Sequence, residues 1–384
     1  MTAFHGRTVI AAAGCTTLTV NSGLSVLDLA TRACRDAISR AGADVGEIDG
    51  ISTFSMYGDS VPPESVAAAL GMGELSYVMD YQSGGTMPSF LVANAAMAVF
   101  TGMARSVLVF RALNGRSGIR IGRTSQGGAA LAYRHSIGYT GWPQVMAMLA
   151  RRYMVETGAT EECLAAVAIA QREYAALNER AIKRDLLTMD EYFASPYIAA
   201  PYRKHDCTTE VDGAHAVLVT TLDRARDLRL RPVIISGSAW TTTGYDVEGG
   251  GLHHYRDMSR NYTSHLAPRL WVSGGLSPSD VDVAELYDCF TGNVLMSLEG
   301  LGFCGRGEAG DFVKDGHTRL TGSLPVNTHG GLLSEGYVHG MNTVSEAVWQ
   351  LQASAGHRQV EGARIAVVTS GSSNAGSALI LTSE

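Results

Sequence analysis

Charged residues are scarce in this chain, and no run of basic residues occurs in it. Asp, Glu, Lys and Arg make up 17% of the 384 residues, whereas hydrophobic residues make up 46%. Disordered proteins have the opposite balance, so the composition excludes disorder. The 30 basic and 37 acidic residues give a net charge of −7. Without a basic cluster, the chain is predicted to bind neither nucleic acid nor an anionic membrane surface.

The sequence also lacks a zinc-binding spacing of cysteines. The N-terminal segment MTAFHGRTVIAAAG lacks the charged and long apolar stretches of a signal peptide. The longest apolar run, residues 90–110, contains Asn94, Gly102 and Arg105 and is too broken to span a bilayer. We therefore predict a cytoplasmic globular protein without membrane insertion and without a bound metal. Its six cysteines are scattered without a CxxC pair, which is typical of buried or free thiols in a reducing compartment: Cys15, Cys34, Cys163, Cys207, Cys289 and Cys304.

Standard catalytic signatures are absent as well. There is no GxSxG nucleophile elbow, no phosphate-binding P-loop and no HExxH metalloprotease motif. The glycines at 249–251 are followed by His253 and His254, a combination more typical of a surface loop than of a metal site. The motifs thus predict none of the serine-hydrolase, P-loop or zinc-protease functions.

Hydrophobic, β-branched runs alternate with helical patterns along the chain, and glycine is abundant, with 44 residues. This alternation predicts an α/β fold in which helices cover sheets. The clearest helix spans 25–41, capped by Ser25 and ended by Gly42. Further predicted helices are 86–101, 145–157, 161–178 and 340–352, and predicted strands are 7–13, 50–53, 106–111, 214–220, 232–237, 283–286, 364–369 and 377–382.

The segment from about 114 to 203 differs from its surroundings, because it is mostly helical and richer in charged and aromatic residues. Such an excursion between core elements is a common place for substrate contacts. The β-rich regions before and after residue 225 suggest two similar halves. We therefore predict an N-terminal half of residues 1–225, which contains the helical insertion, and a C-terminal half of residues 226–384.

Three polar, glycine-rich segments lie where a strand is predicted to end or a helix to begin. They are 81–86 (YQSGGT), 285–293 (ELYDCFTGN) and 327–340 (NTHGGLLSEGYVHG). Helix N-termini favour negative charge, and strand ends in α/β sheets are where ligands bind. A tight turn explains the first segment equally well. The third combines two histidines, a tyrosine and four glycines, which is unusual for a loop that only connects two elements.

Together these segments resemble the thiolase superfamily, and within it the sterol-carrier-protein-type branch of lipid-transfer proteins. The resemblance covers nearly the whole chain and includes AGADVGEIDGI, RRYMVETGATEECLAAVA, AELYDCFTGNVLMSLEGLGFCGRGEAGDFVKDG and LPVNTHGGLLSEGYVHG. It implies a five-layer αβαβα fold built from two similar halves, a homodimer, and a coenzyme A thioester as ligand. It implies no permanently bound cofactor.

The sequence departs from thiolases at every catalytic position. The acyl-accepting cysteine of the family's Cys-x-Ser-Gly turn matches Tyr81 or Gln82. The histidine of His-Asp-Cys-Phe is replaced by Tyr287, the histidine of Gly-His-Pro by Tyr337, and the second cysteine by Ser370. Acyl transfer through an acyl-cysteine requires a thiolate nucleophile. The resemblance therefore does not extend to thiolase activity.

The Tyr-Asp-Cys-Phe and Gly-Tyr-Val-His-Gly variants resemble those of the steroid side-chain-cleaving aldolases. That resemblance implies retro-aldol cleavage of a β-hydroxyacyl-CoA side chain from the steroid D ring, which yields a 17-ketosteroid and propionyl-CoA. It also implies a heteromeric complex with a partner protein that carries an OB-fold and zinc-ribbon domain.

A retro-aldol cleavage needs a base, an enolate-stabilising donor and an acid, but no covalent nucleophile. Burial raises the ordinary tyrosine pKa of about 10, which makes a neutral phenol a good hydrogen donor. We predict that Tyr287 and Tyr337 share the acid and base roles; which residue takes which role stays open, and both could instead be core aromatics. The residues predicted to support the substrate or its oxyanion, some of which could equally be caps or turn residues, are Asn293, His329, His339, Ser83, Gly84, Gly330, Gly331 and Ser370.

Two other functions fit the same residues. A degenerate thiolase scaffold could be a non-catalytic acyl-CoA or sterol-CoA binding protein of the lipid-transfer type, which would bind its ligand without turnover. A condensing or thiolytic enzyme could instead use an unorthodox nucleophile such as Cys289 or Cys304. The aldolase is favoured over both, because the missing residues are the ones that a retro-aldol reaction does not need.

Overall fold

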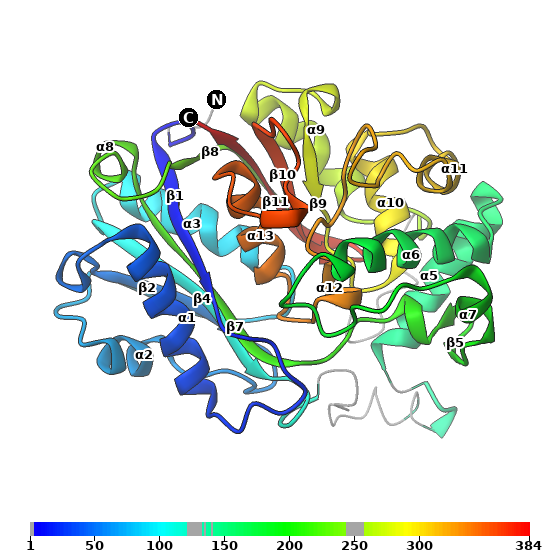
Figure 1. Ribbon diagram of the computed structural model, residues 1–384, viewed down its shortest axis with the longest axis horizontal. Helices are drawn as coiled ribbons and strands as arrows, with labels where there is room; N and C mark the ends of the chain where they lie inside the picture. The colour runs from blue at the N-terminus through cyan, green and yellow to red at the C-terminus, as the bar shows by residue number, and fades with distance from the viewer. Residues whose placement is uncertain (1–3, 121–132, 134–135, 140, 243–256) are drawn as a thin grey trace.

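The computed structural model describes residues 4–120, 133, 136–139, 141–242 and 257–384. The described residues form a nine-stranded mixed sheet with the order β3-β2-β4-β7-β1-β8-β11-β10-β9 (Figure 1). β2 runs parallel to β3 and β4, and β9 runs parallel to β10. The predicted surface loop with His253 and His254 lies outside the described residues. The strands of the sheet are β1 (Thr8–Cys15), β2 (Gly50–Ser55), β3 (Tyr77–Gln82), β4 (Ser106–Asn114), β7 (Asp212–Thr221), β8 (Val233–Thr241), β9 (Val283–Glu285), β10 (Ile365–Ser372) and β11 (Ala375–Ser383).

The sheet folds around two central helices, α3 (Pro88–Phe100) and α13 (Met341–Leu351). Each contacts strands on both sides of the central β1–β8 pair, including β7 on one side and β11 on the other. On the outer faces, α1 (Val26–Ala41) covers β1, β4 and β7, and α9 (Thr263–Gly274) covers β8 and β11 (Figure 1). The order helix, sheet, helices, sheet, helix is the predicted five-layer αβαβα arrangement. The two parts of the sheet are joined because β1 also pairs with β8.

The boundaries of α1 follow directly from local sequence. The Ser25 hydroxyl accepts a hydrogen bond of 3.1 Å from the Asp28 N–H, and Gly42 ends the helix in the left-handed conformation, with φ of 69°. Leu29 and Ala33 are buried on the face that packs on the sheet. The helix predicted over 25–41, with its cap and its end, is therefore confirmed.

Between β4 and β7 the described residues are mainly helical. They form α5 (Trp142–Thr157), α6 (Glu161–Ala176) and α7 (Met189–Ala194), followed by the short strands β5 (Tyr197–Ala199) and β6 (Tyr202–Arg203). α5 and α6 pack on α10 (Thr291–Leu301), and α6 also packs on α11 (Ala309–Lys314) and α12 (Gly331–Ser334). Two short helices complete the secondary structure relevant here, α2 (Pro63–Leu70) and α8 (Leu222–Ala225).

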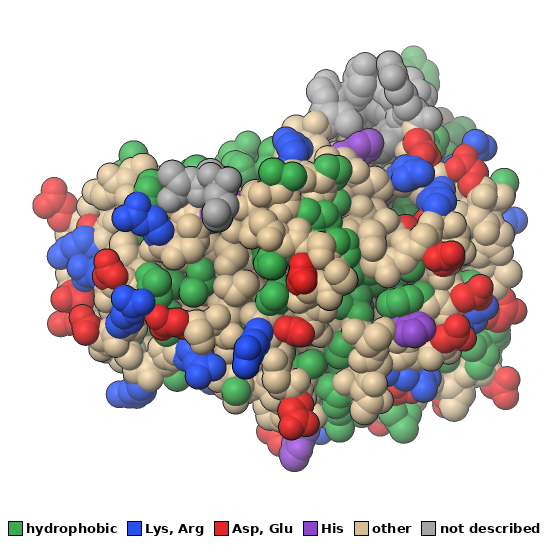
Figure 2. Space-filling model, turned by 90° about the horizontal axis from the view of Figure 1, so that it is seen from above, with side chains coloured by type: hydrophobic (Ala, Val, Ile, Leu, Met, Phe, Trp, Pro, Cys, Tyr) green, Lys and Arg blue, Asp and Glu red, His purple; other side chains and the backbone are tan. Residues whose placement is uncertain are grey.

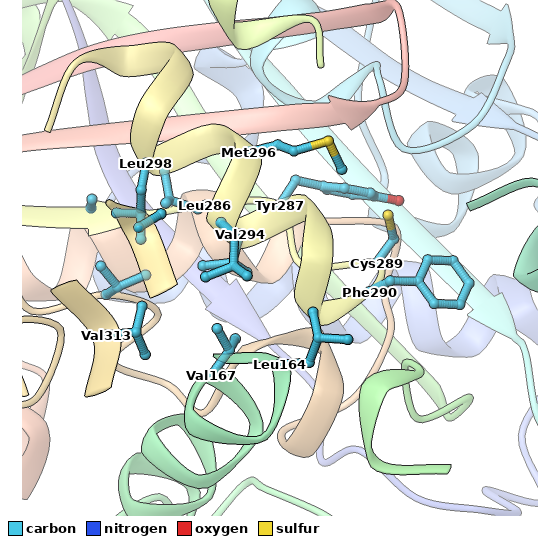
Figure 3. Packing of buried hydrophobic residues seen from close by; sticks show 14 of the residues in the cluster. Leu164, Val167, Leu286, Tyr287, Cys289, Phe290, Val294, Met296, Leu298 and Val313 are labelled. Atoms are coloured by element: carbon cyan, nitrogen blue, oxygen red, sulfur yellow. The ribbon is translucent and has the colours of Figure 1, made fainter. Parts of the chain in front are cut away.

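One hydrophobic cluster joins these helices to the region that follows β9. Figure 3 shows Leu164 and Val167 of α6 pointing toward Val294 of α10, with Tyr287 and Cys289 at the rim of the cluster. Tyr287 is therefore part of a packed core that also contains side chains of α6 and α10.

The surface shows no large area of a single charge on the face seen from above. Figure 2 shows acidic and basic side chains interspersed over this face, with hydrophobic side chains between them. None of the helices in the described ranges combines the length and the apolar character needed to cross a membrane.

Candidate active site

Two tyrosines that lie 50 residues apart in the sequence meet in the fold. The phenol oxygens of Tyr287 and Tyr337 are 2.8 Å apart and share a hydrogen bond, and their rings are in an edge-on arrangement with centroids 6.4 Å apart. Tyr287 follows β9 and is only 3% exposed, whereas Tyr337 precedes α13 and is partly exposed. The predicted catalytic pair is thus one hydrogen-bonded unit, with Tyr337 as the more accessible member.

A glycine-rich turn lies against the Tyr287 phenol. A Cβ atom added at Gly85 would lie 1.8 Å from the Tyr287 hydroxyl oxygen, and one added at Gly340 would lie 2.7 Å from its ring. Neither site accepts a side chain unless the tyrosine moves. Gly85 was not among the predicted site residues, although it directly follows the predicted Gly84. The double glycine in the YQSGGT segment was the signal that could have identified it.

The same turn is tied to β2 and leads into α3. The Ser83 N–H donates to the Ser55 carbonyl over 3.0 Å, and the Met87 N–H donates to the Gly84 carbonyl over 3.2 Å. The Ser83 and Thr86 hydroxyls are 3.4 Å apart. The helix α3 begins at the next residue, so its positive N-terminal end lies close to the tyrosine pair. The predicted Ser83 and Gly84 thus belong to the turn whose Gly85 lies against the Tyr287 phenol, and Gly84 itself faces Met56.

Both phenols resist ionisation. Burial raises the pKa of Tyr287 well above 10, and its contact with Tyr337 raises the pKa further. Burial also raises the pKa of Tyr337, but the hydrogen bond from Tyr287 and the charge of Arg111 oppose that increase. Both phenols are therefore predominantly neutral at neutral pH, and Tyr337 is the one whose neighbours include groups that favour its ionised form.

The thiols are poorly suited to nucleophilic attack. Burial raises the pKa of the Cys289 thiol well above its usual range, and it raises that of Cys304 to about 12. A thiol reacts through its thiolate form, which both environments disfavour. The structure thus gives no support to the alternative of an unorthodox cysteine nucleophile.

Asn293 and Ser370 hold the backbone around the pair. The Asn293 amide donates to the Tyr287 carbonyl over 2.5 Å and to the Gly371 carbonyl over 3.3 Å. The Ser370 hydroxyl lies 2.9 Å from the Ser89 hydroxyl and accepts a hydrogen bond of 3.2 Å from the Ser89 N–H. Both predicted residues are buried and have their hydrogen bonds within the protein.

His329 lies in a buried network of charged side chains. Its Nδ1 atom is 2.9 Å from a Glu285 carboxylate oxygen, and its Nε2 atom is 3.9 Å from Glu335. Burial by itself lowers the pKa of His329, but these carboxylates outweigh burial and raise the pKa to about 9. The network also includes Arg180 and Glu346, which are paired at 3.3 Å. No contact with either tyrosine is found for His329 in the described residues.

The two predicted glycines after His329 pack closely against neighbouring residues. A Cβ atom on Gly330 would lie 2.7 Å from Ala175 of α6, and one on Gly331 would lie 2.1 Å from the Asp288 carboxylate. Both residues have positive φ, 97° and 65°, which glycine adopts most readily. The Asp288 carboxylate in turn accepts hydrogen bonds from the Leu332 and Leu333 N–H groups at the start of α12. These predicted positions therefore shape the loop that carries Tyr337.

His339 is the predicted histidine that touches the pair. Its ring centroid lies 4.7 Å from that of Tyr337. Its Nδ1 atom is 2.7 Å from the nearest nitrogen of Arg111, which also pairs with Asp59. Sequence analysis did not identify Arg111 or Asp59. Among the residues that the structure describes, no group of three His, Cys, Asp or Glu side chains is arranged to hold a metal ion.

Known proteins are similar to this chain over nearly its full length. The model of the family described as thiolase C-terminal domain-like matches residues 244–383. A lyase of 17-hydroxy-3-oxo-4-pregnene-20-carboxyl-CoA from Mycobacterium tuberculosis is 41% identical over 98% of this chain and 99% of its own. A steroid side-chain-cleaving aldolase from Thermomonospora curvata is 40% identical over 91% of both chains. The chain therefore belongs to the thiolase superfamily.

Within that superfamily it belongs to the branch that contains the steroid side-chain-cleaving aldolases, which are carbon–carbon lyases. The solved structure of an Ltp2-ChsH2(DUF35) aldolase superimposes with a TM-score of 0.92 at 38% identity, covering 99% of this chain and 98% of the other. The predicted fold and family are confirmed by these matches.

Proposed function

We propose that this chain is a retro-aldolase that cleaves the side chain of a steroid acyl-CoA into a 17-ketosteroid and propionyl-CoA. The similar lyase from Mycobacterium tuberculosis is named for 17-hydroxy-3-oxo-4-pregnene-20-carboxyl-CoA, which is a β-hydroxyacyl-CoA. The observation that carries the proposal is the 2.8 Å contact between the Tyr287 and Tyr337 hydroxyls, in a chain without a cysteine at the matching thiolase turn.

The proposed step breaks the bond between the carbinol carbon of the D ring and the α carbon of the thioester. The hydroxyl proton passes to a base, the carbinol becomes a ketone, and the electron pair enters the thioester enolate. Protonation of the enolate at its α carbon then gives propionyl-CoA. Atoms and charge balance without an oxidant or a covalent enzyme intermediate, so the reaction does not need the lost nucleophile.

We assign the base role to Tyr337 and the donor role to Tyr287. Tyr337 is partly exposed, and the Tyr287 hydroxyl is positioned to donate to its oxygen while that oxygen carries the negative charge of the phenolate base. Tyr287 lies deeper, against Gly85 and the start of α3, where the helix N-terminus favours the negative charge of an enolate. In the balanced step, the Tyr337 phenolate takes the carbinol proton and the Tyr287 hydroxyl gives its proton to the α carbon of the enolate. Transfer of the proton from Tyr337 to Tyr287 across their hydrogen bond then restores both residues.

We further propose that the chain works as a homodimer in a complex with a partner that carries an OB-fold and zinc-ribbon domain. β3 is an edge strand of the described sheet, and its Val78 and Tyr81 are 40% and 43% exposed. An unpaired strand edge with exposed hydrophobic residues favours pairing with a second copy. The similar Ltp2-ChsH2(DUF35) aldolase, whose name couples two proteins, supports the heteromeric part of the proposal.

The test is to incubate the purified chain, with and without its co-expressed partner, with 17-hydroxy-3-oxo-4-pregnene-20-carboxyl-CoA. Products are identified by mass spectrometry, and the mass of the complex is measured by light scattering. The expected products are the 17-ketosteroid and propionyl-CoA. A thioester that binds but remains intact with the partner present would contradict the proposal and favour the binding-protein alternative.

The tyrosine roles are tested with Tyr287→Phe and Tyr337→Phe, which each remove one oxygen. Loss of an acid or base is expected to lower kcat by about 10²- to 10⁴-fold. The matched control is Tyr174→Phe, because Tyr174 is equally buried but donates its hydrogen bond to the Thr318 carbonyl. Wild-type rates in both pair variants would refute the assignment.

A further inference from the structure

Arg111 is the only charged residue of β4, and its side chain is completely buried. A central strand that is covered on both faces normally carries an uninterrupted hydrophobic run. Burying a guanidinium is costly unless its charge and its hydrogen-bond donors are satisfied. A buried arginine within β4 therefore calls for a specific explanation.

The contacts of Arg111 satisfy its charge and orient it. One terminal nitrogen donates to the Phe54 and Ala112 carbonyls over 3.1 and 3.2 Å. The other pairs with the buried Asp59 carboxylate and lies 2.7 Å from His339 Nδ1. The Nε atom also donates to His339 Nδ1, over 3.1 Å. Two N–H groups of one guanidinium thus converge on a single imidazole nitrogen.

These contacts determine the state of His339. Arginine stays protonated in proteins, so His339 Nδ1 must be the acceptor and the ring hydrogen must be on Nε2. Burial lowers the pKa of His339 well below 6.5, and the Arg111 charge lowers it further. The imidazole is therefore neutral, and it lies between the guanidinium and the Tyr337 ring, 4.7 Å from the latter.

Arg111 is the cation with the largest influence on Tyr337 among the described residues. Glu210 lies beside Tyr337 in a short β-bridge, and its carboxylate is paired with Arg120. The other ionisable groups that face Tyr337 are Tyr287 and Cys289 after β9, Asp59 after β2, Arg111 on β4 and its own neighbour His339.

We propose that Arg111, held by Asp59, is a positioning residue that fixes His339 as the support of the Tyr337 ring and makes Tyr337 the member of the pair that accepts negative charge. This inference rests on the proposed function, because it explains how two equivalent phenols take different roles. Among the described residues, the groups with the largest influence on the pKa of Tyr287 include no cation.

The kinetic test measures kcat/KM against pH for Arg111→Met, Arg111→Lys and the double variant Asp59→Asn/Arg111→Met. Removing the cation makes Tyr337 harder to deprotonate, so the ascending limb of the Arg111→Met profile should shift to higher pH by about one unit. At pH values below that limb, kcat/KM should be about tenfold lower than in wild type. The lysine variant keeps the charge but loses the paired N–H contacts with His339, so its limb should lie between those of wild type and Arg111→Met. The double variant, which leaves no unpaired carboxylate, should lie between them.

The matched control is Arg172→Met, because Arg172 is also buried but contacts Ser334 and the Asp185 carbonyl. The ascending limb of kcat/KM against pH should lie at the same pH in Arg172→Met as in wild type. If Arg111→Lys lost as much activity as Arg111→Met, the charge would play no part, the role of Arg111 would be only structural, and the proposal would be overturned.

A second measurement needs no turnover and therefore separates this inference from the proposed function. In ¹⁵N-histidine-labelled protein, the His339 signal is assigned by its loss in His339→Gln. We expect an unprotonated Nδ1 and a protonated Nε2, without change between about pH 5 and 8. A wild-type His339 that titrates within this range would overturn the proposal even if the aldolase activity is found.

Discussion

His329 is expected to make the folded protein more stable at neutral than at alkaline pH. Its imidazole lies 2.9 Å from Glu285 and 3.9 Å from Glu335, and all three side chains are buried. Burial lowers its pKa, but the carboxylates outweigh burial and raise it from 6.5 to about 9. By linkage, that difference corresponds to about 3 kcal/mol of folding free energy.

The direction follows from which state binds the proton more tightly. Because the folded-state pKa is raised, the stabilisation is fully present below pH 6.5 and is lost as the pH rises through about 9. Lys183 acts in the opposite direction, since burial lowers its pKa to about 8. Its contribution is present in both wild type and a His329 variant, so a comparison of the two cancels it.

The assay is urea unfolding of wild type and His329→Gln at about pH 6 and about pH 9.5. The difference in unfolding free energy between the two proteins should shrink by about 3 kcal/mol from the lower to the higher pH. The exposed His265 provides the control, because His265→Gln should follow the wild-type pH dependence. Parallel curves for wild type and His329→Gln would refute the reasoning.

Two further substitutions test how the site is built. Gly85→Ala would place a Cβ atom 1.8 Å from the Tyr287 hydroxyl, so kcat/KM should fall at least about tenfold. The control is Gly73→Ala, which should leave kcat/KM unchanged because a Cβ atom there would meet no heavy atom within 4 Å. Equal activity of the two variants would contradict the role assigned to Gly85. Asn293→Leu leaves the Tyr287 and Gly371 carbonyls without their donor, so urea unfolding should show a loss of about 2–4 kcal/mol. An unfolding midpoint equal to that of wild type would show that the amide is dispensable.

Local sequence was sufficient to predict a helix whose first and last residues are marked by capping residues close by in the sequence. The helix after Ser25 was predicted with its cap and its end because both depend on residues within a few positions. The strand β3 and the helix α2 were missed. β3 is an edge strand whose side chains are mostly exposed, so it lacks a clear hydrophobic pattern. α2 has only eight residues, too few for a periodicity to stand out.

The site was predictable only in part. The resemblance identified Tyr287 and Tyr337, but their 2.8 Å contact depends on how β9 and the start of α13 meet, which no local pattern encodes. Arg111 was missed because its partners Asp59 and His339 are 52 and 228 residues away in the sequence. The available signal was a single charged residue in an otherwise hydrophobic strand.

The backbone around Tyr287 is held from both sides by groups that take no part in the proposed chemistry. The Thr369 hydroxyl accepts a hydrogen bond of 2.9 Å from the Tyr287 N–H, and the Asn293 amide donates to the Tyr287 carbonyl. Because these contacts are made to main-chain atoms, they place whichever side chain occupies this position. A tyrosine that replaces the thiolase histidine at this position is therefore expected to keep the same backbone placement. In the proposed reaction, the phenol of Tyr287 acts through the group that its hydroxyl contacts, which is Tyr337.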